Sequence, residues 1–246
     1  MHRRALVAAA SAAAVLADRA HARAVLEETA DVDMLLVLAV DCSSSIDDAE
    51  ARLQREGYRA AFEDAAVQRR IAAGAHGAIG VAYVEWSGIE FQRLLLPWAR
   101  IGGPAEARGW SEALMRHPLV PGARRRGTSL SGALDFARMV LAEAPWGAAR
   151  RVVDVSGDGA NNSGPSPEEA RDRSVAEGIT VNALAIEGSD PAETWLPPGI
   201  RLAEYYRATV IGGGGAFVAE AEGFDDFAAA LRRKLVRELS GRIGTA

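Results

Sequence analysis

The feature that most constrains the fold is an apolar run followed directly by a short polar stretch. Residues 32–40 are almost entirely apolar, and Asp41, Ser43 and Ser45 follow at alternating positions. Such a run is long enough for a buried strand and too short to cross a bilayer. The polar stretch therefore lies at the end of a strand. Alternate residues of extended backbone project to one side, so one carboxylate and two hydroxyl groups are expected to face one point, with Cys42 and Ser44 pointing away.

Two further polar positions stand where later elements begin or end. Thr128 precedes a helical pattern, and Asp158 follows a short apolar strand. Oxygen ligands of this kind suit a hard divalent cation such as Mg2+, with Mn2+ or Ca2+ as alternatives. A metal site that begins with Asp41, Ser43 and Ser45 could therefore be completed by a hydroxyl of the Thr128-Ser129 segment and by the carboxylate of Asp158.

The rest of the chain alternates strands with helices. Strands are expected at 32–40, 78–86, 90–98, 151–155, 179–186 and 216–219, and helices at 46–70, 104–116, 129–143, 166–177, 201–210 and 224–239. This alternation predicts an α/β fold with a doubly wound, mostly parallel sheet and helices on both faces. Because Pro97 is tolerated at a sheet edge, 90–98 is expected to be the hairpin partner of 78–86 there. Ligands bind such sheets beyond the carboxyl ends of the strands, where Asp41 and Asp158 are expected.

Two helix starts carry local signals. Ser45 is the expected N-cap of helix 46–70, with Leu53 on its apolar stripe and Arg55 facing solvent. Ser166 and Pro167 are expected to begin another helix, with a capping-box glutamate following them.

The combination of three motifs resembles a known family. Asp-x-Ser-x-Ser at 41–45, a distant Thr128 and a strand-terminal Asp158-Gly159 are together similar to a von Willebrand factor type A (vWA) domain with a metal-ion-dependent adhesion site. The similarity extends from about residue 32 to about residue 239, and segments 82–87 and 155–159 resemble exported bacterial members whose function is not characterised.

This resemblance implies a Rossmann-like fold with an antiparallel edge strand, and a role for each site residue. Ser43, Ser45 and Thr128 would bind the metal directly, whereas Asp41 and Asp158 would act mainly through water. One coordination position would remain for a Glu or Asp of a protein partner. The first hypothesis is therefore a metal-dependent protein-binding module rather than an enzyme.

The N-terminus predicts export. A basic start at 1–4 is followed by an Ala-rich apolar stretch and Ala-x-Ala sites, which indicates a secretory signal over 1–24 with cleavage after Ala22 or Ala24. A retained Ala-rich amphipathic helix is the alternative. We expect one domain over 25–246, without a later membrane span, in the periplasm or outside the cell. The net charge of −5 gives no case for nucleic-acid binding.

Two other functions stay open at this stage. A metal-dependent hydrolase or phosphatase is the first alternative, but position 43 is Ser, so an Asp-x-Asp nucleophile pair is absent, and Glu85 is the only acid considered as a base. The third reading is a structural domain in which Asp41 and the serines only cap the next helix.

Four other features receive structural interpretations. The glycine spacing at 122–129 is that of a phosphate-binding loop, but Thr128 occupies the position of the required lysine, which excludes nucleotide binding. Arginines 124–126 are interpreted as a solvated loop that can steer an acidic ligand. Cys42, the single cysteine, is expected to be a small buried residue, and Asp154 a buried acid paired with a neighbouring strand or an arginine.

Overall fold

The computed structural model describes residues 31–120, 126–188 and 194–240, so the expected signal over 1–24 and Arg124 and Arg125 lie outside the described residues. The strands are β1 (Val32–Asp41), β2 (Ile79–Trp86), β3 (Gln92–Ile101), β4 (Ala148–Gly157), β5 (Thr180–Ile186) and β6 (Val218–Ala221). The helices are α2 (Asp48–Glu63), α3 (Ala65–Ala72), α4 (Pro104–Arg116), α5 (Leu130–Ala142), α6 (Pro167–Ala176), α8 (Leu202–Thr209) and α9 (Phe224–Ser240).

The six strands form one sheet in the order β3-β2-β1-β4-β5-β6. All neighbouring pairs are parallel except β2 and β3, which are antiparallel. This confirms the predicted doubly wound, mostly parallel sheet with one antiparallel edge strand. Pro97 lies exposed on β3, where a missing N–H leaves no ladder bond unmade.

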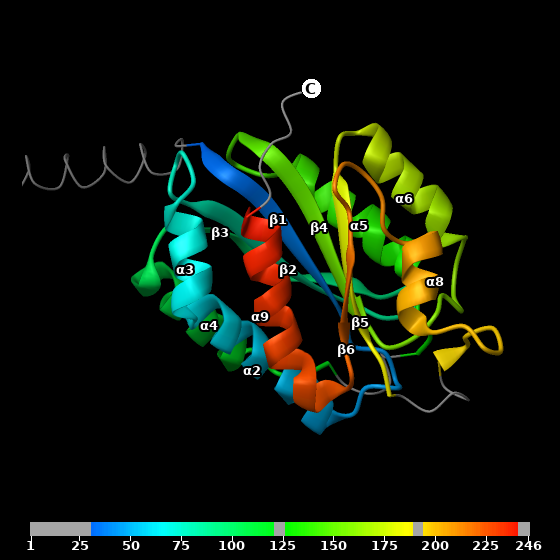
Figure 1. The fold of residues 1–246 in the computed structure, drawn as a ribbon. Coiled ribbons are helices and arrows are strands. Elements are labelled where there is room, and N and C mark those ends of the chain that lie inside the picture. Colours follow the sequence, from blue (N-terminus) through cyan, green and yellow to red (C-terminus); the bar gives the residue numbers. More distant parts are fainter. Residues whose placement is uncertain (1–30, 121–125, 189–193, 241–246) are drawn as a thin grey trace, which may run out of the picture.

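Helices cover both faces of the sheet (Figure 1). Helices α2, α3, α4 and α9 lie on one face, and α5, α6 and α8 lie on the other. Strand β1 is buried on both sides: Leu36 and Leu38 contact the first helix layer, while Val37 and Ala39 contact the second. A strand enclosed in this way is a near-continuous apolar run, which explains the composition of residues 32–40.

The single helix predicted at 46–70 is two helices. Asp64 has extended backbone between them and accepts a hydrogen bond from the Ala66 N–H at 2.7 Å. The predicted N-cap was also wrong: Asp47 caps α2, with a reciprocal bond from its own N–H to the Glu50 side chain. Because Asp47 caps the helix, the Ser45 hydroxyl is available for another contact.

The buried face of α2 also differs from the prediction. Leu53 is 42% exposed, whereas Arg55 is only 4% exposed. The guanidinium of Arg55 lies 2.6 Å from the Glu85 carboxylate of β2. An arginine can therefore occupy the inner face of this helix, because the buried acid Glu85 of β2 neutralises its charge.

Two strand boundaries also moved. Strand β4 begins at Ala148 and not at 151, and the last strand spans Val218–Ala221 and not 216–219. Helix α6 begins at Pro167 with Ser166 at the N-cap position, as predicted, but the Ser166 hydroxyl donates to the Glu168 carboxylate and accepts no capping bond from a backbone N–H. Among the described helices, none combines the length and the apolar character needed to cross a membrane.

Candidate metal centre

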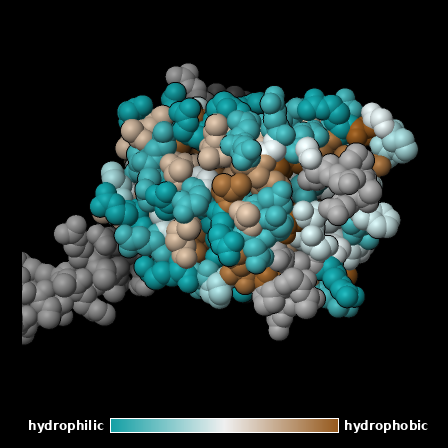
Figure 2. Space-filling model, turned by 90° about the horizontal axis from the view of Figure 1, so that it is seen from below, coloured by the Kyte–Doolittle hydropathy of each residue, from teal (hydrophilic) through white to brown (hydrophobic). Residues whose placement is uncertain are grey.

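Adjacent strands bring the two predicted site acids to one edge of the sheet. Strand β1 ends at Asp41, and its neighbour β4 ends at Gly157, one residue before Asp158. This carboxyl edge is the lower one in Figure 1, and Figure 2 views it directly. Both acids are buried, at 0% and 1% exposure. Two carboxylates removed from water at one edge require compensation by hydrogen bonds or by a cation.

The turn after β1 adds the two serines to this pair. The Ser43 N–H donates to Asp41 Oδ1 at 2.7 Å, and the Ser43 and Ser45 hydroxyl oxygens lie 3.1 Å apart. The Ser45 hydroxyl donates to Asp158 Oδ1 at 2.9 Å. Four of the five predicted residues are thus joined in one hydrogen-bonded group.

The cause of this convergence differs from the predicted one. The strand ends at Asp41, and a turn closed by an Ile46 N–H bond to the Ser43 carbonyl follows. The serines therefore come together through a turn and not through strand alternation. Ser44 is exposed, and Cys42 is buried with its thiol donating to the Trp86 carbonyl, as expected for a small structural residue.

One oxygen of this group lacks a partner. Asp41 Oδ2 is buried and accepts no hydrogen bond from the part of the chain that the structure describes. Burial, with repulsion from the Asp158 carboxylate as the second cause, raises the pKa of Asp41 well above its ordinary value. The groups that lower this pKa are hydrogen bonds from Ser43 and from the Asp158 backbone, and none is a cationic side chain of the described residues.

The space around the orphaned oxygen is tight on one side. A Cβ atom at Gly157 would lie 2.9 Å from Asp41 Oδ2 and 2.7 Å from the Tyr206 hydroxyl oxygen. The Tyr206 hydroxyl donates to the Gly159 carbonyl at 3.1 Å. Gly157 and Tyr206 therefore shape the site, although sequence reasoning did not find them, because nothing local marks a glycine at a strand end or a tyrosine on a distant helix.

Thr128 lies in the loop before α5, and Asn162 fixes its backbone. Thr128 N–H donates to Asn162 Oδ1 at 2.8 Å, and the Thr128 carbonyl accepts from the Asn162 N–H at 2.9 Å. Asn161 Oδ1 accepts from the Leu130 N–H at 2.8 Å. The segment carrying Asp158 thus also positions Thr128, a role for Asn161 and Asn162 that was not predicted. The backbone bonds between Thr128 and Asn162 tie Thr128 to the segment that follows Asp158.

The candidate ligands are carboxylate and hydroxyl oxygens, a donor set that fits a hard cation. The described residues contain no group of three or more His, Cys, Asp or Glu that could hold a metal. The candidate centre instead combines two carboxylates with hydroxyl groups, which are ligands that Mg2+ accepts. Glu85 is not a free base near it, because one oxygen contacts Arg55 at 2.6 Å and the other contacts Arg93 at 2.7 Å.

A second group of buried charges lies further back along β4. Asp154 is 1% exposed, and its Oδ2 lies 2.5 Å from Lys234 Nζ of α9. Glu238, one helical turn later, lies 3.3 Å from the same ammonium group. Asp154 is thus a buried, paired acid, but the partner is a lysine from the last helix and not a neighbouring strand or an arginine.

The topology and the residues at the carboxyl edge define a class. The sheet order, the antiparallel edge strand and the Asp-x-Ser-x-Ser turn are those of a vWA-like fold, and solved structures agree. A proximal thread matrix protein from the mussel byssus matches with a TM-score of 0.60 and 18% identity, over 85% of this chain and 48% of that chain. The vWF domain of the type V pili tip protein Mfa5 from Porphyromonas gingivalis matches with a TM-score of 0.54 and 12% identity, over 88% and 99%.

Within this class, the chain belongs to the family described as "Protein of unknown function (DUF1194)", whose model matches residues 31–243. No curated protein matches the sequence significantly. The pilus adhesin SpaC from Lactobacillus rhamnosus GG is similar with a TM-score of 0.58 and 14% identity, over 85% of this chain and 30% of that chain. This chain spans about half the length of the mussel protein, one structure of which is described with a zinc-occupied metal-ion-dependent adhesion site.

Proposed function

We propose that this protein is a metal-dependent protein-binding module whose bound Mg2+ is presented to an acidic residue of a partner. The observation that carries the proposal is Asp41 Oδ2, which is buried beside a second buried carboxylate and has no hydrogen-bond partner in the described part of the chain. A buried carboxylate oxygen that accepts nothing is costly, and a divalent cation satisfies it and offsets the repulsion between the two acids. The adhesion-type names among the structural neighbours support the same reading.

Each site residue has a distinct part in this proposal. Ser43, Ser45 and Thr128 would supply neutral hydroxyl ligands, and Asp41 and Asp158 would supply the negative charge. A metal held in this way keeps much of its positive charge, because most of its direct ligands are neutral. It would supply a Lewis-acidic point of attachment for a carboxylate from outside the chain.

The proposed location follows from the sequence. The basic start, apolar stretch and Ala-x-Ala sites within 1–24 are typical of a signal that directs export. We propose that the domain acts in the periplasm or outside the cell, where a pilus, envelope or secreted protein would be the partner.

Calorimetric titration of Mg2+ and of Mn2+ into metal-stripped protein tests the centre. Saturable binding is expected in the wild type and is expected to be lost in an Asp41→Ala, Asp158→Ala variant that remains folded. Asp172→Ala, which removes an exposed acid of α6, is the control and should bind metal normally. Saturable binding that survives in the double variant would place the metal elsewhere and reject this centre.

Capture from a cell-envelope extract tests the partner. Immobilised protein should retain a partner in Mg2+ and release it in chelator, and the Asp41→Ala, Asp158→Ala protein should not retain it. Replacing the acidic residue that the partner presents should abolish capture. Equal capture with metal and with chelator would show that recognition does not pass through a cation.

A further inference from the structure

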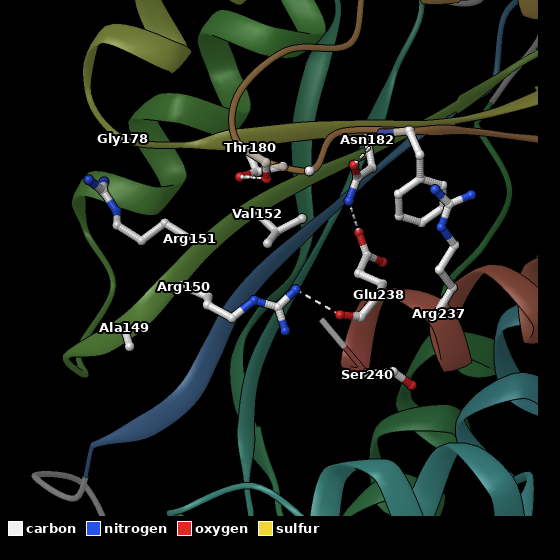
Figure 3. A pocket seen from close by; sticks show the side chains of 13 residues that line it. Ala149, Arg150, Arg151, Val152, Gly178, Thr180, Asn182, Arg237, Glu238 and Ser240 are labelled. Carbon is white, nitrogen blue, oxygen red and sulfur yellow. Dashed lines mark hydrogen bonds between the residues drawn. The ribbon is translucent and has the colours of Figure 1, made fainter. Parts of the chain in front are cut away.

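A cavity of about 700 Å³ opens at the opposite, amino-terminal edge of the sheet. It forms because the strands are staggered: Val152 of β4 is the first residue paired with β5, so residues 148–151 extend beyond that neighbour. Strand β6 begins later still, with Val218 opposite Ala183. The stepped edge leaves a hollow between β4, β5 and the last turn of α9 (Figure 3). Its volume is typical of sites that bind small molecules.

Arginines line this cavity on several sides. Arg150 and Arg151 come from the overhanging end of β4, and Arg237 comes from α9. Each is anchored by an uncharged group. Arg150 donates to the Glu238 carbonyl at 2.7 Å, Arg151 donates to the Glu177 carbonyl at 3.3 Å, and the Arg237 guanidinium lies 3.8 Å from the centre of the Phe217 ring.

None of the three arginines has a carboxylate partner in the described part of the chain. The Glu177 carboxylate pairs with Arg138 and not with Arg151. A guanidinium has five N–H donors, and each of these groups uses few of them. The anchors therefore orient three positive charges and leave most of their donors available to a ligand.

The one acid that lines the cavity among the described residues already has partners within the chain. The Glu238 side chain is fully buried, accepts a bond from Asn182 at 2.5 Å and lies 3.3 Å from Lys234. It therefore does not offer a free negative charge to the cavity. The charge that a ligand meets there is that of the arginines.

The remaining wall is a glycine-rich loop. Residues 212–215 are all glycine, and Gly214 and Gly215 line the cavity at positions where an added Cβ atom would meet no other atom within 4 Å. Thr180 lies beside them, with its hydroxyl 3.5 Å from the Gly214 carbonyl. Backbone N–H groups in such open loops approach anions closely, because no side chain intervenes.

We propose that this cavity binds a small organic polyanion that carries at least two oxyanion groups, carboxylate or phosphate. Arg151 and Arg237 lie on opposite sides of the cavity in Figure 3, so one oxyanion group does not bridge them. Arginine binds carboxylate and phosphate oxygens in forked pairs, which gives both groups of the ligand a suitable donor. The site is at the far edge of the sheet from Asp41 and does not depend on the proposed metal function.

Calorimetry with citrate and with inorganic pyrophosphate, at low ionic strength, tests this site. Because both probes chelate metals, the titrations use metal-stripped protein and are repeated in the Asp41→Ala, Asp158→Ala variant. We expect saturable binding of one or both probes in both proteins. Arg237→Ala and Arg151→Glu should each weaken it by about tenfold or more, since each removes charge-assisted hydrogen bonds.

Arg232→Ala is the matched control, because Arg232 is an exposed arginine of α9 that does not line the cavity. It should leave binding unchanged. The absence of saturable binding of both probes to folded protein would overturn the proposal, as would equal affinity in the arginine variants. If acetate bound as tightly as citrate, and monophosphate as tightly as pyrophosphate, the assignment to a ligand with two oxyanion groups would be wrong.

Discussion

Two pairs of buried acids differ in where their balancing charge comes from: Asp154 of β4 with Glu238 of α9, and Asp158, just after β4, with Asp41 of β1. Asp154 and Glu238 contact Lys234, whose side chain is fully buried between them. Asp41 and Asp158 lie at the carboxyl edge, and no cationic side chain of the described residues contacts Asp41. The same sheet thus holds one acid pair that shares a buried lysine and one in which no cation of the described residues contacts Asp41.

Under the proposed function, this difference separates a structural use of buried charge from a binding use. The lysine that Asp154 and Glu238 share ties α9 to the sheet, although Asp154 Oδ1 accepts no hydrogen bond from the described residues. An acid such as Asp41, which no described cation contacts, remains costly until a ligand supplies the charge, and that cost favours binding. The difference is tested by changing the charge beside one acid pair, or the room around it, and comparing the result with the other pair or with a matched position.

The largest effect is expected from removing the internal cation. Lys234→Met leaves Asp154 and Glu238 buried together, so the free energy of unfolding should fall by about 3–5 kcal/mol. Urea denaturation at pH 7 measures it. Arg233→Met, an exposed neighbour that pairs with Asp226, should cost much less. A loss below about 1 kcal/mol for Lys234→Met would show that the lysine is not required to hold these acids, and the contrast with Asp41 would fail.

Supplying the external cation should give the next effect. Mg2+ at about 100 times its dissociation constant should raise the free energy of unfolding of the wild type by about 2.7 kcal/mol, because only the folded state forms the site. Asp41→Asn should abolish this response. It should also stabilise the metal-free protein by about 1 kcal/mol, because a neutral amide keeps the bond from Ser43 without the buried charge.

Thermal and urea unfolding with and without Mg2+ measure both parts, and Asp172→Asn is the control for loss of one negative charge. If Asp41→Asn destabilised the metal-free protein strongly, the carboxylate would be a structural acceptor and the contrast with Asp154 would fail.

The sequence predicted the acids of the carboxyl edge better than the partners of Asp154. Asp41, Ser43 and Ser45 are close in the chain, and Asp158 ends a strand, so local pattern and strand order sufficed to bring them to one edge. The Lys234 partner of Asp154 is on α9, far along the chain, and the helical pattern of that segment gives no sign that one charged residue points inward. Arg55 escaped prediction for the same reason, since its partner Glu85 is on another element.

The parts of the site that were missed have a common physical origin. Tyr206, Gly157 and Asn162 act through contacts between elements that meet only after folding, and single-sequence periodicity carries no information on them. The strand–helix alternation, by contrast, depends on burial repeated over many residues, and the predicted sheet was confirmed on this basis. The turn at Ser43–Ser45 lies between these cases: its residues were found, but its backbone was taken to be extended.

Crowding distinguishes the two edges as well. Gly157→Ala would place a methyl group 2.9 Å from Asp41 Oδ2 and 2.7 Å from the Tyr206 hydroxyl, which should cost about 1–3 kcal/mol and weaken Mg2+ binding. Gly214→Ala at the amino-terminal edge meets no atom within 4 Å and should change neither quantity appreciably. Urea denaturation and calorimetry on both variants make the comparison. Similar costs at the two positions would show that backbone entropy, and not contact with Asp41, governs Gly157.

The smallest effect is the pH dependence of stability that comes from the buried triad, Asp154, Lys234 and Glu238. Burial, opposed by Lys234 and reinforced by Glu238, raises the pKa of Asp154 from 3.8 to about 7. The folded state therefore keeps a proton that the unfolded chain has released, so this contribution to stability is complete below pH 3.8 and is lost as the pH rises through about 7. Asp154→Asn should remove a decline of about 1 kcal/mol between about pH 6 and 8. Urea denaturation of both proteins across that range measures the effect, because titrating groups that do not interact with Asp154 cancel in the difference. Parallel stability profiles of the wild type and the variant would mean that Asp154 is ionised throughout this pH range. Lys234 would then hold Asp154 permanently as the carboxylate of an ion pair.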